Sequence, residues 1–263
     1  MAGITLQEAA DRLGVHYMTA YRYVRLGKLH AEKEGTSWVV DESDLEAFGA
    51  EPPAPRSHED WEGDLVRLLL AGDPTAAWGL VEDALASSFS PEQFHTDLLL
   101  PAMRSVGDRW ISGEIDIADE HLASAVARRI VSRLSPRFVR RGRDRGTVVV
   151  AMGPGEWHQL GAEVLADLLR GRNFRVLYLG ANTPAEAVVR AAKNVDDLVA
   201  ICVAAFESAE GLAEIGALLD GSGVPVVMGG PVVGSQADVE RLGGDVFGAS
   251  IPAIVDWVDD FAG

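Results

Sequence analysis

The spacing of apolar and polar positions changes twice along the chain and divides it into three blocks. In the first block, residues 6–14 carry apolar positions at helical spacing and end in glycine, which predicts a short amphipathic helix. Residues 18–27 predict a second helix after a short turn, and residues 30–40, with Gly35 at a turn, predict a hairpin wing. We therefore expect a winged helix-turn-helix domain over residues 1–49.

Helical spacing continues through the second block, residues 59–143, and predicts four helices. Pro74, Pro91 and Asp116 lie near the expected helix starts, where proline and aspartate are favoured. Four helices joined by short loops predict a four-helix bundle. The proline-rich residues 50–58 predict a stiff, polar linker between the first block and this bundle.

The third block, residues 144–263, alternates short apolar runs with amphipathic segments. Such alternation requires crossover helices, so it predicts a Rossmann-like, doubly wound sheet of parallel strands. The segments are, in order, VVVAM, AEVLADLLRG, RVLYLG, PAEAVVRAAKN, LVAICVAA, GLAEIGALLDG, VPVVMGG and ADVERLGG. The expected fold class is therefore multidomain α and α/β.

Composition and charge narrow the classes of function. The 263 residues are 48% hydrophobic, which is enough for more than one folded domain. A formal net charge of −17 disfavours nonspecific nucleic-acid binding, although a local basic surface can still dock on DNA. Cys202 is the one cysteine and excludes a disulfide within the chain. Without a secretory leader or a run of about 20 apolar residues, we expect a cytoplasmic protein with no membrane partner.

Basic residues gather on the second predicted helix of the first block. Residues 15–31 contain no Asp or Glu but carry Arg22, Arg25 and Lys28. A helix that enters the major groove needs such groups for phosphate and base contacts. The block resembles the excisionase-like branch of the MerR superfamily, which implies that these three residues bind operator DNA. The alternative is a three-helix packing module whose arginines only solvate a surface.

His158 stands in the loop between the strand VVVAM and the next predicted helix. Ligands of open α/β sheets bind at the carboxyl ends of the strands, where this loop lies. A neutral imidazole can bind a metal through one nitrogen while the other donates to a carboxylate, and Glu156 lies two residues earlier. A lone loop histidine is more often a surface residue, so the surrounding sequence decides its interpretation.

That sequence resembles the cobalamin-binding domain shared by methionine synthase, corrinoid methyltransfer proteins and B12-dependent photoreceptors. The matching segments are GEWHQLG, YLGANTP and MGGP, after the first, second and fourth strands. The resemblance implies that His158 ligates cobalt and that Glu156 fixes its tautomer. It implies a corrin site formed by Glu156, Trp157, His158, Gly161, Leu179, Asn182, Thr183, Ala204, Phe206, Ser208, Gly229 and Gly230.

Glycine at positions 161, 229 and 230 is expected to leave room for the corrin and its nucleotide tail. One departure concerns the end of the third strand, where the family has Ser-x-Leu and this chain has Ala204 and Phe206 around Ala205. Ser208 lies nearby as a substitute for the missing serine. The alternative for this block is a flavodoxin-like sheet without a corrin.

The third helix of the bundle ends near Trp110, and nine residues separate this tryptophan from Glu120 and His121. This spacing resembles the motif of the CarH/LitR family of adenosylcobalamin photoreceptors, whose bundle caps the upper face of the corrin. The resemblance implies that Trp110 packs on the 5′-deoxyadenosyl group and that Glu120 and His121 bind its polar atoms. The alternative is a core tryptophan near two polar helix-surface residues.

A second departure lies beside this tryptophan, where the best-known photoreceptors have a histidine that ligates cobalt after illumination and this chain has Ile111. Isoleucine cannot ligate cobalt, so we expect His121, His95 or water at the upper site. Some relatives also pair cobalamin with a bilin such as biliverdin, which leaves a second chromophore as an alternative. Cys202 is a poor bilin anchor because it lies within a predicted strand.

Together these features predict an adenosylcobalamin-dependent, light-sensing transcriptional regulator that is not an enzyme. Photolysis is expected to change the oligomeric state, a dimer or tetramer, and with it DNA binding, since a single small head binds DNA weakly. Residues 119–121 are not expected to form a metal site, because adjacent residues on a helix point in different directions. The alternatives are a corrinoid methyl carrier and a light-independent cobalamin or redox sensor.

Overall fold

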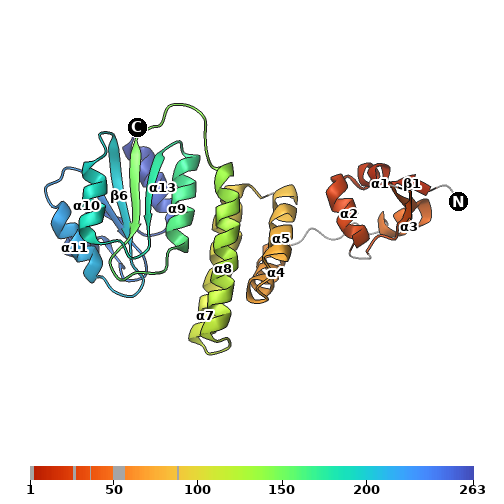
Figure 1. The fold of residues 1–263 in the computed structure, drawn as a ribbon, viewed down its shortest axis with the longest axis horizontal. Helices are drawn as coiled ribbons and strands as arrows, with labels where there is room; N and C mark the ends of the chain where they lie inside the picture. Colours follow the sequence, from red (N-terminus) through yellow and green to blue (C-terminus); the bar gives the residue numbers. More distant parts are fainter. Residues whose placement is uncertain (1–2, 26–27, 36, 50–56, 88) are drawn as a thin grey trace.

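The computed structural model describes residues 3–25, 28–35, 37–49, 57–87 and 89–263. They form three units in chain order: an N-terminal head, a helical bundle, and a parallel sheet covered by helices (Figure 1). The predicted fold class, multidomain α and α/β, is confirmed.

The head contains two helices of a helix-turn-helix and a three-stranded antiparallel sheet of order β1-β3-β2. Its elements are β1 (Gly3–Thr5), α1 (Leu6–Leu13), α2 (Tyr17–Arg25), β2 (Glu32–Glu34), β3 (Ser37–Asp41) and α3 (Glu42–Gly49). Thr5 and Glu8 cap the start of α1 reciprocally, and Gly14 ends it with a φ of 67° that favours glycine. The two predicted helices and the hairpin are confirmed, whereas β1 and α3 were not predicted.

The bundle consists of four long helical segments. They are α4 (His58–Leu70), α5 (Pro74–Ser87), the run of α6 (Pro91–Gln93), π-helical η1 (Phe94–Leu99) and α7 (Leu100–Ile111), and α8 (Ile117–Leu134) with the short η2 (Ser135–Arg137). The predicted helix starts near Pro74, Pro91 and Asp116 are confirmed, and Ser90 and Asp116 form capping boxes. Most of the predicted linker, residues 50–56, lies outside the described residues.

The third unit is a sheet of five parallel strands in the order β5-β4-β6-β7-β8. Its elements are β4 (Thr147–Met152), α9 (Leu160–Gly171), β5 (Arg175–Gly180), α10 (Ala185–Lys193), β6 (Leu198–Ala204), α11 (Glu210–Leu219), β7 (Val226–Gly229), α12 (Gln236–Arg241), β8 (Val246–Gly248) and α13 (Ile251–Phe261). Strand β8 and helix α13 extend beyond the predicted segments.

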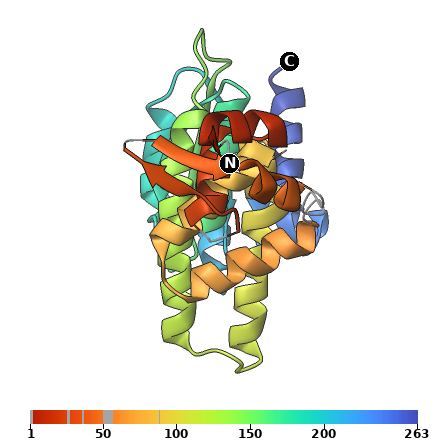
Figure 2. The same cartoon turned by 90° about the vertical axis from the view of Figure 1, so that its right-hand side faces the viewer.

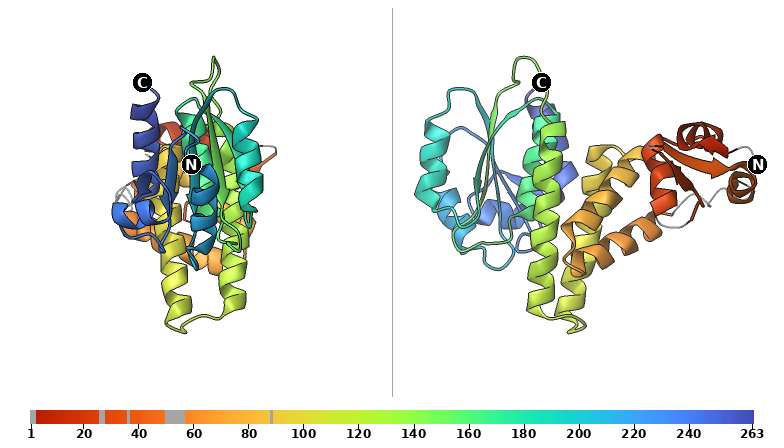
Figure 3. Two further views of the ribbon diagram at one scale, coloured as in Figure 1. Left: turned by 90° about the vertical axis from the view of Figure 1, so that its left-hand side faces the viewer. Right: turned by 45° about the vertical axis from the view of Figure 1, so that its right-hand side comes forward.

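Helices cover both faces of this sheet, as the doubly wound prediction requires (Figures 1 and 3). Buried residues of α9 and α13 share one apolar core with the bundle, and those of α10 and α11 form a separate core on the opposite face. The bundle is therefore packed on one face of the sheet unit through α9. Among the described residues, no helix combines the length and the apolar character needed to span a membrane.

Candidate functional site

The carboxyl ends of β4 and β6 lie side by side, because the two strands pair in parallel with Met152 opposite Ala204. From β4 the chain continues to α9 on the bundle side of the sheet, and from β6 it continues to α11 on the other side. Loops that diverge in this way form the crevice in which open α/β sheets bind ligands. The loop that carries His158 is one wall of this crevice.

Glu156 and His158 form the central polar pair. His158 Nδ1 lies 2.7 Å from Glu156 Oε1, and the backbone N–H of His158 donates to the same oxygen at 2.8 Å. The other carboxylate oxygen accepts from the backbone N–H groups of Phe206 and Glu207, after β6. Glu156 is buried, whereas half of the His158 side chain is exposed. The pair therefore ties the two loops together and leaves the imidazole accessible.

The hydrogen bonds that Glu156 accepts determine the tautomer of His158. Burial acts to raise the pKa of Glu156, but the N–H groups of His158 and Phe206 outweigh burial and lower that pKa below its usual value. An ionised carboxylate only accepts hydrogen bonds, so Nδ1 of His158 carries the proton. The free lone pair is then on Nε2, so this nitrogen could ligate a metal ion.

Asn182 holds the same loop from the side of β5. Its side-chain Oδ1 accepts from the backbone N–H of Gly155 at 2.8 Å, and its own N–H donates to the Glu156 carbonyl at 2.7 Å. Its φ of 46° lies in the left-handed region, which asparagine tolerates better than most residues. The neighbouring Thr183 is buried, with Oγ1 3.2 Å from the Gly180 carbonyl. Both residues order the backbone behind His158.

Two exposed aromatic residues belong to the loops at His158, and one of them contacts the imidazole. Trp157 is 68% exposed and Phe206 is 41% exposed, and the Phe206 ring centroid lies 5.2 Å from that of His158. Exposed aromatic rings beside a polar pair in a crevice are typical of a ligand-binding site. The Tyr178 hydroxyl donates to Gln159 Oε1 at 3.1 Å, a contact beside His158 that the sequence did not predict.

The remaining predicted residues lie around the strand ends. Leu179 and Ala204 are partly buried, and Ser208 is exposed, with its Oγ accepting from the Glu210 N–H at 3.2 Å. A hydroxyl is thus present near the position of the missing family serine, although it lies beyond the end of β6.

Two of the three predicted glycines are required by the protein's own backbone. A Cβ at Gly229 would lie 3.0 Å from the carbonyl oxygen of Gly248, and one at Gly230 would overlap the carbonyl of Ala205. At Gly161, a Cβ would meet only an isoleucine methyl at ordinary contact distance. Packing of the sheet unit therefore explains Gly229 and Gly230 without a ligand.

One end of the bundle projects beyond the sheet unit, because α8 extends past the start of α9. Arg128 of α8 pairs with Glu163 of α9 at 3.0 Å, and Ser135 donates to Asp167 of α9 at 2.5 Å, so the two helices run side by side. Residues 117–124 therefore extend about 12 Å beyond the first residue of α9, at 1.5 Å per residue. Figure 2 shows α7 and α8 projecting together at this end.

Trp110, Glu120 and His121 all lie on this projection. Trp110 is 44% exposed. One oxygen of Glu120 accepts from Ser124 Oγ at 2.6 Å, and the other lies 2.9 Å from His121 Nδ1. The contacts of Glu120 with His121 and with Ser124 were not predicted. The described residues nevertheless contain no cluster of three metal-ligating side chains.

His95 does not fit the upper cobalt site, which corrects one of the expected alternatives. It is completely buried in the bundle, with Nε2 3.4 Å from Asp167 Oδ2 and its ring stacked on Phe138. Ile111, in contrast, is 79% exposed beside Trp110. Cys202 is buried in β6, and burial raises the pKa of its thiol to about 12. This thiol is therefore unsuited to anchoring a bilin.

The predicted DNA-binding residues lie on or directly after α2. Arg25 and Lys28 are exposed. Arg22 forms an ion pair with Asp83 of α5 and thereby joins the head to the bundle. Tyr17 and Tyr21 pack against the head core, whereas Arg22 is directed to the bundle and Arg25 is exposed.

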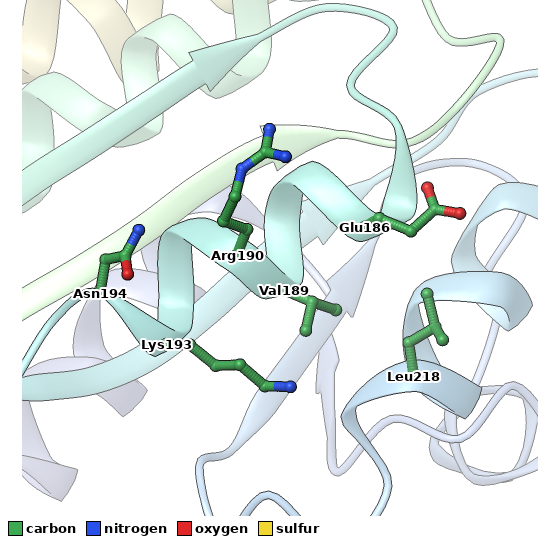
Figure 4. Close-up of a pocket in the computed structure, with 6 residues that line it drawn as sticks. All are labelled: Glu186, Val189, Arg190, Lys193, Asn194 and Leu218. Carbon is green, nitrogen blue, oxygen red and sulfur yellow. The ribbon is translucent and has the colours of Figure 1, made fainter.

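A shallow hollow lies on the far face of the sheet unit, between α10 and α11 (Figure 4). It is lined by Glu186, Val189, Arg190, Lys193, Asn194 and Leu218. None of the predicted cofactor residues lines it, so it is separate from the crevice at His158.

Comparison with known proteins agrees with these three units. Two models described as a B12 binding domain match residues 61–135 and 146–253, and a helix-turn-helix domain matches residues 4–51. The HTH-type transcriptional repressor CarH of Myxococcus xanthus is 32% identical over 212 residues, covering 78% of this chain and 70% of that protein. Trimethylamine corrinoid protein 1 of Methanosarcina acetivorans is 25% identical over 192 residues, covering 70% of this chain and 88% of that protein.

Among solved structures, the monomethylamine corrinoid protein of Methanosarcina barkeri matches with a TM-score of 0.67 at 18% identity, covering 78% of this chain and 99% of that chain. This likeness concerns the fold alone. In this chain the helix-turn-helix domain precedes the two B12 binding domains. The chain belongs to the CarH-like family of B12-binding transcriptional regulators.

Proposed function

We propose that this cobalamin-dependent transcriptional regulator senses light through adenosylcobalamin and that light changes its oligomeric state and its binding to operator DNA. One observation carries the proposal: the pair of His158 and Glu156 lies in the crevice at the carboxyl ends of β4 and β6. Trp110 and Glu120 lie on the part of the bundle that projects beyond the same end of the sheet unit. When bound, adenosylcobalamin supplies a cobalt–carbon bond that light can break.

The residues of this chain divide the binding task between two sides. His158 Nε2 would hold the cofactor from the side of the sheet, and Glu156 holds that ring in one tautomer. Trp110 offers a half-exposed apolar surface from the bundle, and the Glu120–His121 pair offers polar atoms beside it. Through these residues the bundle and the sheet edge would both hold the cofactor, so the hold on α7 and α8 would depend on what Trp110 and Glu120 contact.

The DNA response follows from oligomerisation, because a single head presents few basic groups to DNA. A dimer or tetramer engages repeated half-sites at once and binds far more tightly than one head. Shifting the population from mostly bound to mostly free needs about 5 kcal/mol of differential stabilisation between the two states. Ile111 supplies no imidazole beside Trp110, so His121 or water is the expected upper ligand after illumination.

The test uses full-length protein loaded with adenosylcobalamin in darkness. We expect loss of the alkyl-cobalt absorption bands after green light, together with a change in native mass and in affinity for operator DNA selected in vitro. Bleaching without any change in mass or affinity would contradict the switch. Dark DNA affinity that differs between adenosylcobalamin and hydroxocobalamin but ignores light would indicate a ligand sensor instead.

His158→Ala tests the cofactor site separately. We expect weaker cobalamin retention and loss of the absorption spectrum of a histidine-ligated corrinoid. The matched control is His30→Ala, which removes an exposed histidine of the head. An unchanged spectrum in His158→Ala would mean that another group ligates cobalt.

A further inference from the structure

An arginine-rich loop, residues 137–145, connects the bundle to the sheet unit. It contains Arg137, Arg140, Arg141, Arg143 and Arg145 against the single acidic residue Asp144. The whole chain carries a formal net charge of −17, with only 23 lysines and arginines. Positive charge is therefore concentrated in this loop, whereas the rest of the chain is strongly acidic.

The backbone of the loop is held by the turn that follows α9. Arg140 Nε donates to the Gly171 carbonyl at 3.2 Å, and Asn173 Nδ2 donates to the Arg143 carbonyl at 2.6 Å. At the far end, Arg145 pairs with Asp259 of α13 and stacks over Phe174. The loop is thus a fixed feature of the surface, and its position does not depend on its outward side chains.

Three arginines of this loop point their charge into solvent. Arg137, Arg141 and Arg143 are exposed, and their guanidinium groups have no hydrogen bond or ion pair with any described residue. The side chains of Arg140 and Arg145 bond to other parts of the sheet unit, whereas the side chains of these three arginines do not. A fixed loop that presents three unpaired guanidinium groups is suited to binding an external anion.

The loop lies toward the end of the bundle that carries the DNA-binding head. It follows the carboxyl end of α8, where Arg133 stacks over Trp78 of α5. Farther along α5, Asp83 pairs with Arg22 of the head. Figures 1 and 3 show the loop at the upper end of α8 and the head beside the upper part of α5. The crevice at His158 lies at the opposite end of the sheet unit.

We propose that residues 137–145 form a second DNA contact, in which Arg137, Arg141 and Arg143 bind phosphates of the duplex next to the segment held by the head. This inference rests on the proposed DNA binding by the head. Duplex DNA repels an acidic protein unless basic surface faces it, and the described part of the head offers few exposed cations. They are Arg12, which is paired with Glu42, and Arg25, Lys28 and Lys33. Arginine binds phosphate oxygens in a bidentate manner, and no base sequence is needed for such contacts.

The test measures binding of a fluorescent, mixed-sequence 60-base-pair duplex (a length of about six helical turns) to adenosylcobalamin-loaded protein in darkness, over a series of KCl concentrations. The loop variant combines Arg137→Gln, Arg141→Gln and Arg143→Gln. The matched control combines Arg104→Gln, Arg190→Gln and Lys193→Gln, which removes the same charge from exposed sites outside the loop. Native mass is measured for each protein.

We expect the slope of log affinity against log salt to become less steep by about 0.9 for each phosphate that the variant no longer binds, so by up to about 2.7 in the loop variant. The control should retain the wild-type slope. Equal slopes in the loop variant and the wild type would overturn this inference alone, while an absence of binding by the wild type would overturn the proposed function as well. A fall in native mass without a change in slope would also overturn it, because the loop would then contact a second copy of the chain.

Discussion

His95 and Asp167 form a buried pair that joins the bundle to helix α9, with His95 Nε2 3.4 Å from Asp167 Oδ2. The second carboxylate oxygen of Asp167 accepts from Ser135 Oγ at 2.5 Å and from Arg170 at 3.0 Å. Among the described residues, His95 Nδ1 has no hydrogen-bond partner. A polar cluster inside an otherwise apolar core favours one docking geometry, because sliding the helices would leave its members unpaired.

Asp167→Ala should therefore lower the free energy of unfolding by about 3 kcal/mol, since it leaves the buried His95 and the hydroxyl of Ser135 without their acceptor. Urea denaturation of the cobalamin-free protein, followed by circular dichroism, measures this change. Asp196→Ala, at an exposed site, serves as the control and should stay within about 0.5 kcal/mol of the wild type. Equal stabilities of the two variants would show that the cluster does not hold the interface.

Such long-range pairs are what the sequence could not predict. His95 and Asp167 are 72 residues apart, and the apolar spacing of each helix shows which face is buried but not which helix it meets. His95 therefore remained an expected cobalt ligand until packing placed it inside the core. The same reason applies to Arg22, whose partner Asp83 lies on another unit.

Contacts between residues that are close in the sequence could be predicted, because the chain itself brings them together. Glu156 and His158 are two residues apart in one loop, so a carboxylate–imidazole contact followed from their order, and the strand alternation placed that loop at the correct edge of the sheet. Strand β8 has only three residues, too few to give a clear pattern. The roles of Gly229 and Gly230 depend on carbonyl groups of neighbouring segments, which no local pattern describes.

The lowered pKa of Glu156 gives a pH-dependent contribution to stability. A carboxyl whose pKa is lower in the folded state stabilises the fold above its unfolded pKa, near 4.5, and this contribution is lost as the pH falls through the lowered value. Glu156→Gln should therefore be less stable than the wild type at pH 7, by about 2 kcal/mol. The difference should shrink as the pH falls below about 4.5.

Urea denaturation at a series of pH values measures this difference. Glu214→Gln changes an exposed carboxyl on α11 and provides the control, for which we expect no pH-dependent difference from the wild type. A gap between wild type and Glu156→Gln that stays constant down to the most acidic condition would contradict the assignment of an ionised Glu156.

Trp110 should distinguish cobalamins by their upper group. Because its ring is 44% exposed on the projection of α7 and α8, truncation removes little of the bundle core but much of the proposed adenosyl contact. Trp110→Ala should weaken adenosylcobalamin binding about tenfold, or ~1.4 kcal/mol, and leave hydroxocobalamin binding nearly unchanged. Equilibrium titration in darkness measures both affinities.

Leu218→Ala is a suitable comparison, since Leu218 is 46% exposed on α11, away from the crevice. It should change neither affinity. Equal losses for both cobalamins in Trp110→Ala would instead mean that the tryptophan contacts the corrin or supports the bundle, without recognising the upper group.

Cys202 should be unreactive in the folded protein. Its side chain is 2% exposed, and burial raises the pKa of its thiol to about 12, so almost no thiolate is present at pH 8. A thiol-disulfide reagent at pH 8 should label none of the native protein and one thiol per chain after unfolding in urea. Fast labelling of the native protein would mean that β6 opens readily, and would contradict the burial argument against bilin attachment at Cys202.

The ion pair between Arg22 and Asp83 should oppose DNA binding, because it engages a basic residue of the proposed recognition helix with the bundle. Asp83→Ala removes this competitor and should raise affinity for a mixed-sequence duplex by up to about fivefold, as partly exposed ion pairs contribute up to ~1 kcal/mol. Asp260→Ala, which removes the same charge at an exposed site on α13, isolates the general effect of net charge. Fluorescence anisotropy in darkness compares the two variants. If the two variants bind DNA equally well, Asp83 does not restrain the head. An increase in DNA affinity that is specific to Asp83→Ala would support the view that the bundle limits access to α2.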